Sequence, residues 1–261
     1  MTGLQPAASA TIETRALVKR YGSTVALDGL TMSVPPGEVF GFLGPNGAGK
    51  TTAIKVLLGL TVASGGEARV LGRPAGDLEA RRRTGYLPEM FRYQAWLTGR
   101  EVLGVHCRLM GLPRGTWDGE IRAALQATGL ADRGSERVSG YSKGMQQRLG
   151  MAVALLGRPD VVFLDEPTSA LDPVGRLEMR PILRALRDRG ATVFLNSHLL
   201  SEVERVCDRV AILDHGRVVA MGRLDELLEE RRLRVRVTGL SDAARAALAR
   251  FGTVGEEDGW L

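Results

Sequence analysis

The sequence lacks any hydrophobic run long enough to cross a membrane. Its longest unbroken apolar stretches, such as residues 151–156 and 161–164, have the length of core elements, whereas a transmembrane helix needs about 18 or more apolar residues. Residues 1–11 have neither the basic start nor the apolar centre of a secretory signal peptide. We therefore expect a protein of the cytosol that has no membrane span of its own.

Cysteine and lysine are both scarce. The two cysteines, Cys107 and Cys207, are a hundred residues apart without metal-ligand spacing around either, which favours buried, unreactive thiols in a reducing compartment. Only four of the 35 basic residues are lysine, and the other 31 are arginine. The formal net charge is +5, but acidic residues are interleaved with the basic ones, so we expect no nucleic-acid partner.

Apolar patterns typical of strands alternate along the chain with patterns typical of helices. This order predicts a doubly wound α/β core around a mainly parallel sheet. The strands that we expect are residues 38–43, 161–165 and 192–196. The helices that we expect are residues 49–60, 174–189 and 224–230, with a short helix after residue 198 and a hairpin around residues 214–216.

Two further segments complete the expected organisation. Residues from about 90 to 150 have longer helical patterns broken by glycine and proline, so we expect a helical subdomain inserted into a main domain of residues 11–231. In residues 232–261, apolar side chains at positions 233, 235 and 237 alternate with arginines, which is the period of a half-buried strand. An alanine-rich helix follows Ser241 and Asp242. We expect a small C-terminal α+β extension here, an accessory segment that stops before it is complete.

A glycine-rich motif stands between an expected strand and an expected helix. It consists of Gly44, Pro45, Asn46, Gly47, Ala48, Gly49, Lys50, Thr51 and Thr52. This is the pattern of a phosphate-binding loop, whose backbone N–H groups surround the β- and γ-phosphates of a nucleotide. In it, Lys50 supplies a compact positive charge and Thr51 a hydroxyl ligand for Mg²⁺. The alternative, a glycine-rich turn that matches by chance, is disfavoured by the flanking strand and helix.

Two carboxylates follow a run of four apolar residues. Asp165 and Glu166 stand at the carboxyl end of the expected strand 161–165, the edge at which open α/β sheets bind ligands. Asp165 would hold Mg²⁺, through a water molecule. Glu166 is one residue further on and points elsewhere, where it could orient and polarise an attacking water. A solvated acidic pair is the alternative.

A third motif narrows the class of nucleotide-binding protein. It consists of Tyr141, Ser142, Lys143, Gly144, Met145, Gln146, Gln147 and Arg148, and Ser142 precedes Asp165 by 23 positions. The motif resembles the signature of ABC ATPases, usually Leu-Ser-Gly-Gly-Gln, in a variant form common among exporters. Ser142 and Gly144 match it, whereas Tyr141, Lys143 and Met145 depart from it. A plain helix N-cap at Ser142 is the alternative.

Further positions resemble the same family across residues 11–231. Tyr21 resembles the aromatic residue that stacks on adenine, with a core tyrosine as the alternative, and His198 resembles the switch histidine. The loop that crosses to a partner subunit would consist of Ser169, Ala170, Leu171 and Asp172. Glu89 stands in the coupling loop, where many ABC ATPases carry glutamine, and this leaves open whether it ligates Mg²⁺ as the amide does.

The resemblance implies an ATPase subunit of an ABC transporter, with a P-loop NTPase core, ATP and Mg²⁺ as its ligands, and a separate integral membrane permease as its partner. It also implies a head-to-tail dimer in which the Lys50 face of one chain meets the Ser142 face of the other. The chain would then be peripheral, on the cytoplasmic side of the plasma membrane. The variant motifs most resemble exporters of drugs, lipids or polysaccharides.

Three other classes are alternatives. A soluble ABC ATPase of translation or DNA repair usually has a second ATPase domain or a long coiled coil, and the sequence has neither. A small-molecule phosphotransferase would have no use for the signature. A regulatory subunit that binds ATP without hydrolysing it is disfavoured because both Glu166 and His198 are present.

Overall fold

The computed structural model describes residues 10–169 and 171–228. The chain divides into two units, Met1–Leu224 and Asp225–Leu261. Helix α8, Leu224–Leu228, begins at the last residue of the first unit. The strand and helix expected in the C-terminal extension, and the domain boundary expected between residues 231 and 232, lie outside the described residues.

The first unit is built on a six-stranded sheet with the order β10-β9-β3-β8-β7-β6. Its strands are β3 (Val39–Leu43), β6 (Thr84–Leu87), β7 (Val161–Asp165), β8 (Thr192–Asn196), β9 (Arg209–Asp214) and β10 (Arg217–Arg223). All neighbouring pairs are parallel except β9 and β10, which form the expected hairpin. The mainly parallel sheet predicted from the sequence is therefore confirmed, and β7 and β8 have the predicted bounds.

Helices cover both faces of this sheet, and the helices before β8 and β9 make the crossovers that parallel strands require. The helices that precede residue 209 are α1 (Lys50–Leu57), α2 (Leu78–Arg82), α3 (Gly99–Leu109), α4 (Trp117–Ala127), α5 (Lys143–Leu155), α6 (Pro173–Asp188) and α7 (Leu200–Val206). Buried residues of α1 pack on one face with Phe40, Phe163 and Phe194. Buried residues of α5, α6 and α7 pack on the other face. Because both faces are covered, every residue of β3, β7 and β8 is buried.

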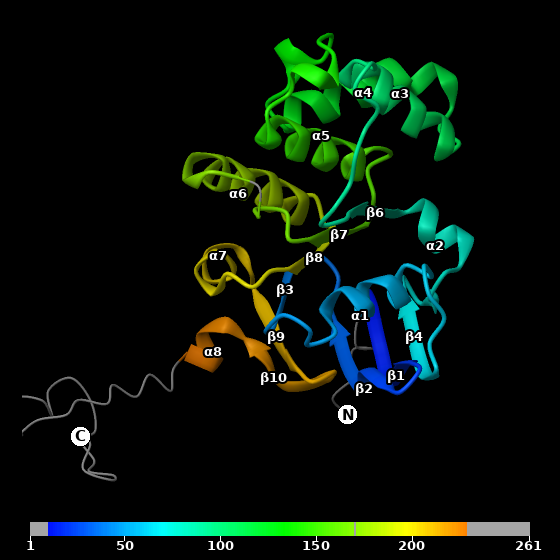
Figure 1. The fold of residues 1–261 in the computed structure, drawn as a ribbon, viewed down its shortest axis with the longest axis vertical. Coiled ribbons are helices and arrows are strands. Elements are labelled where there is room, and N and C mark those ends of the chain that lie inside the picture. The colour runs from blue at the N-terminus through cyan, green and yellow to red at the C-terminus, as the bar shows by residue number, and fades with distance from the viewer. Residues whose placement is uncertain (1–9, 170, 229–261) are drawn as a thin grey trace, which may run out of the picture. The chain divides into compact units, whose positions relative to one another are not determined.

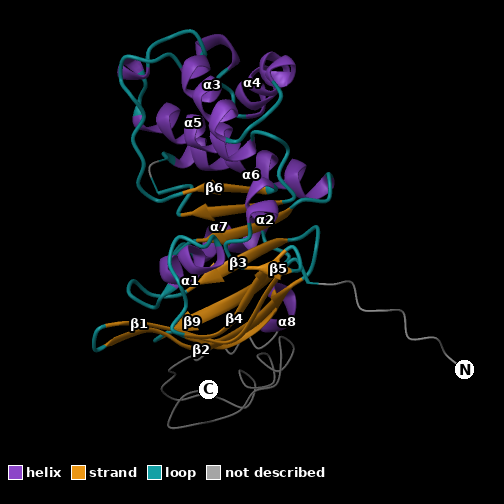
Figure 2. Ribbon diagram, turned by 90° about the vertical axis from the view of Figure 1, so that its right-hand side faces the viewer, coloured by secondary structure: helices purple, strands orange, loops and turns teal. Residues whose placement is uncertain are grey.

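A second, antiparallel sheet with the order β2-β1-β4-β5 was not predicted. Its strands are β1 (Ile12–Tyr21), β2 (Thr24–Val34), β4 (Gly65–Val70) and β5 (Arg73–Pro74). The pairing of β1 shifts register between Thr14 and Leu17, where Ala16 has a φ of 45°. This bulge breaks the alternation of apolar and polar side chains that identifies a strand. Figure 2 shows the strands of both sheets below the helices α3, α4 and α5.

The inserted helical region consists of α3, α4 and α5, which share a core of their own and lie together at the top of Figure 1. Helix α3 begins at Gly99, where Thr98 and Glu101 form a capping box. Helix α5 continues to Leu155, five residues beyond the expected limit of this region. Within residues 10–169 and 171–228, none of the helices is both long and apolar enough for a membrane span.

Glu38, at the amino end of β3, gives the folded protein an expected pH dependence. Burial raises its pKa to about 7, with Asp208 adding to the rise and Arg209 and Arg223 opposing it. Its Oε1 is buried and has no hydrogen-bond partner among the described residues. The folded state therefore binds this proton more tightly than the unfolded chain, so the protonated carboxyl favours folding below about pH 4.5 and that contribution is lost as the pH rises through about 7.

We expect the Glu38→Gln variant to lose this pH dependence, because an amide is neutral at every pH. The melting temperature of the variant should exceed that of the wild type by more at pH 8 than at pH 5. Thermal unfolding of both proteins across this range checks the prediction. Parallel melting temperatures of the two proteins from pH 5 to 8 would show that Glu38 has no raised pKa in the folded state.

Candidate active site

The glycine-rich loop connects β3, which ends at Leu43, to α1, which begins at Lys50. Gly49 has a φ of 105°, in the region that only glycine adopts readily. A Cβ atom on Gly49 would lie 2.3 Å from the Ala26 carbonyl oxygen, and one on Gly44 would lie 2.2 Å from the Leu213 carbonyl oxygen. The loop is therefore pressed against β2 and β9, and its Pro45, Asn46 and Gly47 are exposed.

The side chain of Lys50 is held across this loop. It is buried, and its ammonium nitrogen donates hydrogen bonds to the carbonyl oxygens of Gly44 at 2.8 Å and of Pro45 at 3.0 Å. The Ala48 carbonyl oxygen in turn accepts from the Gly216 N–H at 2.9 Å, in the β9–β10 turn. A positive charge fixed inside a loop of backbone N–H groups is an arrangement that binds phosphate. Thr51 and Thr52 follow in the first turn of α1 and are half-buried.

Asp165, at the end of β7, is paired in register with Asn196 at the end of β8. It is 1% exposed. Its Oδ1 accepts hydrogen bonds from the Asn196 side-chain amide and, at 3.5 Å, from the Thr51 hydroxyl. Its Oδ2 is buried without a hydrogen-bond partner among the described residues. An unpaired buried carboxylate oxygen is costly, so this oxygen fits the expected ligand, a cation.

The chemistry of these donors suits Mg²⁺. Thr51 and Asp165 offer hard oxygen ligands, and Mg²⁺ is commonly held by one or two protein groups together with phosphate oxygens and water. Among the described residues, no group of three or more His, Cys, Asp or Glu side chains could hold a metal ion by itself. The residues therefore fit a metal ion that is shared with a phosphate-bearing ligand.

Glu166 has a backbone φ of 54°, a conformation that costs free energy and is concentrated at functional sites. Its N–H donates to the Asn196 carbonyl oxygen at 3.0 Å, which fixes the backbone turn. Its carboxylate Oε2 lies 2.9 Å from His198 Nδ1. Glu166 is 7% exposed, whereas half of the His198 side chain is exposed. An imidazole that donates from Nδ1 keeps Nε2 free to accept a hydrogen bond.

Two other predicted residues lie on the surface. Tyr21 is 48% exposed at the end of β1, which excludes the alternative of a core tyrosine. Glu89 is exposed in the loop after β6. Burial, with the charges of Asp165 and Glu89, raises the pKa of Tyr86 to about 12. The Tyr86 phenol was not predicted as part of the site. The only signal in the sequence is its position two residues before Pro88, at the start of the loop that contains Glu89.

The signature motif begins helix α5. Ser142 is the N-cap, and its hydroxyl oxygen accepts a hydrogen bond from the Met145 N–H at 3.2 Å. Ser142 and Lys143 are exposed, and Gly144 and Met145 are half-buried. The helix N-cap that was the alternative interpretation of Ser142 is therefore present. It does not cover the amino end of this 13-residue helix, which stays exposed. Buried Gln147, a member of the motif to which no role was assigned, donates from Nε2 to the Pro167 carbonyl oxygen at 2.9 Å and so links α5 to the residue after Glu166.

The segment predicted to cross to a partner follows Glu166 directly. The Ser169 N–H donates to the Glu166 carbonyl oxygen at 3.2 Å. Leu171 is 6% exposed and lies against Gly144, where an added Cβ would approach its Cδ2 to 3.6 Å. Asp172 caps α6 by accepting from the Gly175 N–H at 2.7 Å. Ala170 lies outside the described residues. The signature and this segment are thus neighbours within one chain.

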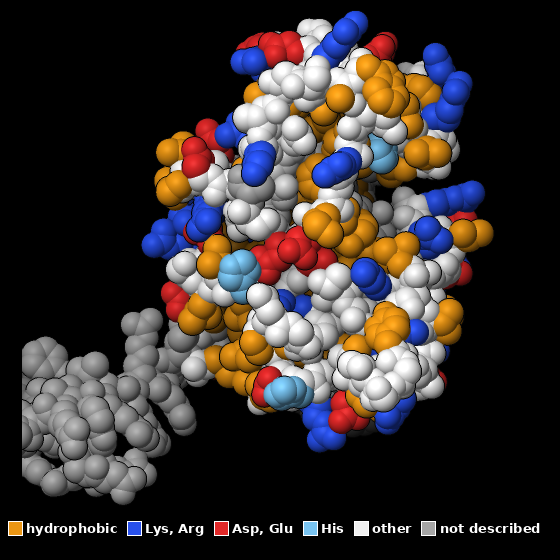
Figure 3. Space-filling view, in the orientation of Figure 1, with side chains coloured by type: hydrophobic (Ala, Val, Ile, Leu, Met, Phe, Trp, Pro, Cys, Tyr) orange, Lys and Arg blue, Asp and Glu red, His pale blue; other side chains and the backbone are white. Residues whose placement is uncertain are grey.

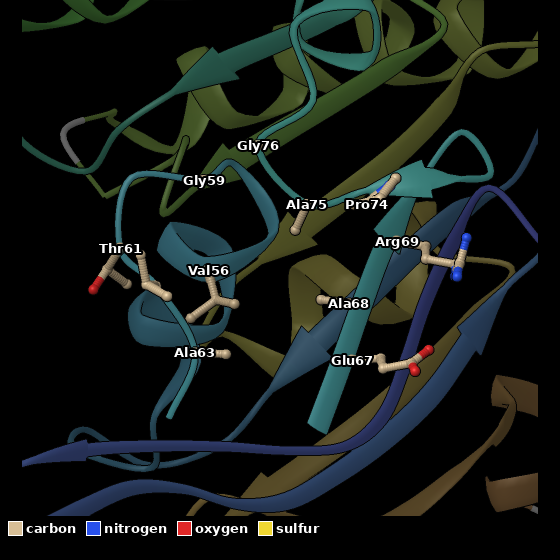
Figure 4. Close-up of a pocket in the computed structure, with 11 residues that line it drawn as sticks. Val56, Gly59, Thr61, Ala63, Glu67, Ala68, Arg69, Pro74, Ala75 and Gly76 are labelled. Carbon is tan, nitrogen blue, oxygen red and sulfur yellow. The ribbon is translucent and has the colours of Figure 1, made fainter. Parts of the chain in front are cut away.

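A hollow of about 450 Å³ lies elsewhere, between the end of α1 and the strands β4 and β5. Small or apolar side chains such as Val56, Ala63 and Ala68 point into it, whereas Glu67 and Arg69 point away (Figure 4). None of the predicted site residues lines it. In the space-filling view, acidic side chains gather in the middle of the molecular face, below the helical region, with a histidine beside them (Figure 3).

Comparison with known proteins gives relatives over most of the chain. The family model described as ABC transporter matches residues 27–169. An ABC transporter ATP-binding protein of Nostoc is 49% identical over 78% of this chain. The daunorubicin/doxorubicin resistance ATP-binding protein DrrA of Streptomyces peucetius is 42% identical over 83% of this chain and 66% of its own length. The bacitracin transport ATP-binding protein BcrA of Bacillus licheniformis is 39% identical over 86% and 73%.

An ABC transporter ATP-binding protein of Synechocystis is 46% identical over 78% of this chain. The chain spans about three fifths of the length of the two cyanobacterial relatives, 62% of the Nostoc protein and 58% of the Synechocystis protein. Among solved structures, the ATP-binding subunit of an ABC transporter has a TM-score of 0.77 at 31% identity, covering 92% of this chain and 99% of the other. The cbiO1 protein of Clostridium perfringens, part of the transporter complex cbiONQ, has a TM-score of 0.76 at 27% identity, covering 85% and 92%. The chain therefore belongs to the family of ABC transporter ATP-binding proteins.

Proposed function

We propose that the chain binds and hydrolyses Mg-ATP as one of two identical ATPase subunits, and that hydrolysis drives a separate membrane permease that exports a drug, a lipid or a polysaccharide. Family membership supports the ATPase activity. Export is supported by relatives named for drug resistance, bacitracin transport and Nod factor export. Such a subunit would lie at the cytoplasmic face of the membrane and would be attached there through the permease.

The pair formed by Glu166 and His198 is the observation on which the proposed hydrolysis rests. A carboxylate that is 7% exposed and fixed at 2.9 Å from an imidazole nitrogen can accept a proton from an attacking water and orient it. His198 holds this carboxylate in place and keeps its second nitrogen for the γ-phosphate or for the water. Lys50, fixed in the loop, would bind the β- and γ-phosphates, and a charge that is already positioned needs little reorganisation.

Thr51 and Asp165 would hold Mg²⁺, which when bound neutralises the charge on the phosphate oxygens. Asn196 positions Asp165 by donating to its Oδ1. This leaves the buried Oδ2 toward the metal or a water molecule bound to it. Glu89 is exposed and carries a carboxylate, so we do not assign it to the metal. Its proposed role is in the coupling loop.

The proposed dimer uses the exposed amino end of α5. The N–H groups and partial positive charge at a helix N-terminus favour an anion, and Ser142 and Lys143 are exposed there. In a head-to-tail pair this end would meet the γ-phosphate bound by Lys50 of the other copy. Ser169 is also exposed, and the loop of residues 169–172 would reach across the same interface.

Exposed apolar side chains in the loop after β6 and at the end of α3 support a permease partner. Met90 is 87% exposed, Trp96 is 71% exposed and Leu109 is 75% exposed. They lie in the loop after β6 and at the end of α3. Contiguous exposed apolar side chains mark interaction sites, and Met90 and Trp96, in the same loop, are proposed to contact the permease. Residues 232–261 are proposed to be an accessory segment that is separable from nucleotide binding in residues 11–231.

ATP hydrolysis and permease binding test the proposal together. The purified chain should hydrolyse ATP in the presence of Mg²⁺, and hydrolysis should stop when EDTA removes the metal. It should also co-purify in detergent with a multi-span membrane protein when the two are produced from neighbouring reading frames, and Trp96→Asp should weaken this association while leaving ATP hydrolysis by the free subunit intact. Activity without a membrane partner in the neighbouring reading frames would favour the soluble ATPase. The absence of Mg-dependent hydrolysis from a folded dimer would contradict the proposal.

A further inference from the structure

Lysine is retained at only four positions of a chain with 31 arginines. Lys50 and Lys143 belong to the phosphate loop and the signature, and Lys55 is an exposed residue of α1. The fourth, Lys19, belongs to none of the motifs identified in the sequence. It is half-buried on β1, two residues before Tyr21.

The ammonium group of Lys19 is fixed from two sides. Its nitrogen lies 4.7 Å from the centroid of the Tyr21 ring, within the range of a cation–π interaction. The same nitrogen donates a hydrogen bond of 2.7 Å to the carbonyl oxygen of Val62. The compact ammonium of Lys19 thus makes a ring contact and a hydrogen bond at once.

The Val62 loop is itself attached to β1. The Arg20 N–H donates to the Ser64 hydroxyl oxygen at 3.0 Å, and the Ser64 N–H donates to the Val18 carbonyl oxygen at 2.7 Å. Val62 is thereby held at a constant place relative to β1. The Lys19 ammonium, anchored to Val62, covers one side of a ring that is otherwise about half exposed.

We propose that Lys19 is a positioning residue for the adenine base: it holds the Tyr21 ring from one face and leaves the other face for stacking. The inference rests on the proposed function, in which Tyr21 stacks on ATP. Fixing the ring before the nucleotide arrives removes part of the entropy cost of ordering it during binding. Lys19 thus increases affinity through the base and leaves the affinity for the phosphates unchanged.

Nucleotide binding by Lys19→Met tests this role, because methionine keeps most of the aliphatic stem and removes the charge. The affinity for Mg-ATP should fall by about 2- to 5-fold, the scale of a cation–π contact at an exposed site. The affinity for inorganic tripolyphosphate with Mg²⁺, which has no base, should not change. Lys19→Arg should recover part of the loss, and Lys55→Met, at an exposed lysine on α1, should behave as wild type.

A double-mutant cycle with Tyr21→Ala separates the inference from the proposed function. Tyr21→Ala alone should lower ATP affinity by about 5- to 150-fold, the scale of base–aromatic stacking, and adding Lys19→Met should then have no further effect. An unchanged ATP affinity in Tyr21→Ala overturns both proposals. If Tyr21→Ala weakens ATP binding but Lys19→Met has no effect, weakens tripolyphosphate binding equally, or has the same effect in both backgrounds, only the role of Lys19 is overturned.

Discussion

Replacement of Glu166 by glutamine is expected to lower ATP turnover by about 10²-fold or more, the usual contribution of a general base, and to leave ATP binding intact. Glutamine keeps the size of the side chain, and its amide oxygen can still accept a hydrogen bond from His198 Nδ1, which lies 2.9 Å from the carboxylate. The amide cannot take a proton from water. ATP would therefore stay bound and hold the two copies together.

Turnover at saturating ATP and size-exclusion chromatography with and without ATP measure the two halves of this prediction. The variant should elute as a dimer only when ATP is present. Glu79→Gln is a suitable control, because Glu79 is an exposed acid that pairs with Arg82 on α2, and it should retain wild-type turnover. Turnover near the wild-type rate in Glu166→Gln would remove Glu166 from the reaction.

Lys50→Ala and Ser142→Arg are each expected to abolish measurable ATP turnover, for different reasons. Lys50→Ala removes a charge that is positioned in the phosphate loop and should weaken ATP binding by about 10- to 100-fold, the scale of a charged hydrogen bond. Ser142→Arg places a long cation at a helix N-terminus, where positive charge is unfavourable, and obstructs the approach of a second copy. It should leave ATP binding to the loop of its own chain intact.

Equilibrium binding of a fluorescent ATP analogue distinguishes these two variants, and circular dichroism shows whether each is folded. Ser139→Arg is the matched control, because Ser139 is exposed three residues before Ser142 and is not part of the signature. It should bind and hydrolyse ATP as the wild type does. Full turnover in Ser142→Arg would mean that the amino end of α5 has no part in hydrolysis.

The sequence was sufficient to predict the parallel core, because strands buried on both faces appear as unbroken apolar runs. Strands β7 and β8 are examples, and their carboxyl ends place Asp165 and Asn196 side by side. Strand β1 could not be recognised, because its bulge at Ala16 interrupts the alternating pattern. The helical region was predicted only as a whole, because the hydrogen bond from the Glu101 N–H to Thr98 that caps α3 is specified by only two residues.

The motifs of the site were also visible in the sequence, whereas the residues that hold them in place were not. Gln147 and Asn196 each contact the site through a partner 20 or 31 positions away in the chain, and no local pattern indicates such contacts. Glu166, which pairs with His198, has a positive φ that the residue type does not suggest. The contacts of Lys19 could not be predicted either, because the sequence shows only that a lysine is retained there in an arginine-rich chain.

The central claim, that each catalytic site combines two copies of the chain, is tested most directly by mixing Lys50→Ala with Ser142→Arg. A mixed dimer has one site with both lesions and one site with neither, in which Lys50 of the second variant faces Ser142 of the first. Because about half of the dimers would be mixed, each with one intact site, the mixture should recover up to about a quarter of wild-type turnover. This recovery should rise with protein concentration. If the mixture shows neither turnover nor ATP-dependent cross-linking of the two variants, although both are folded, the composite site is contradicted.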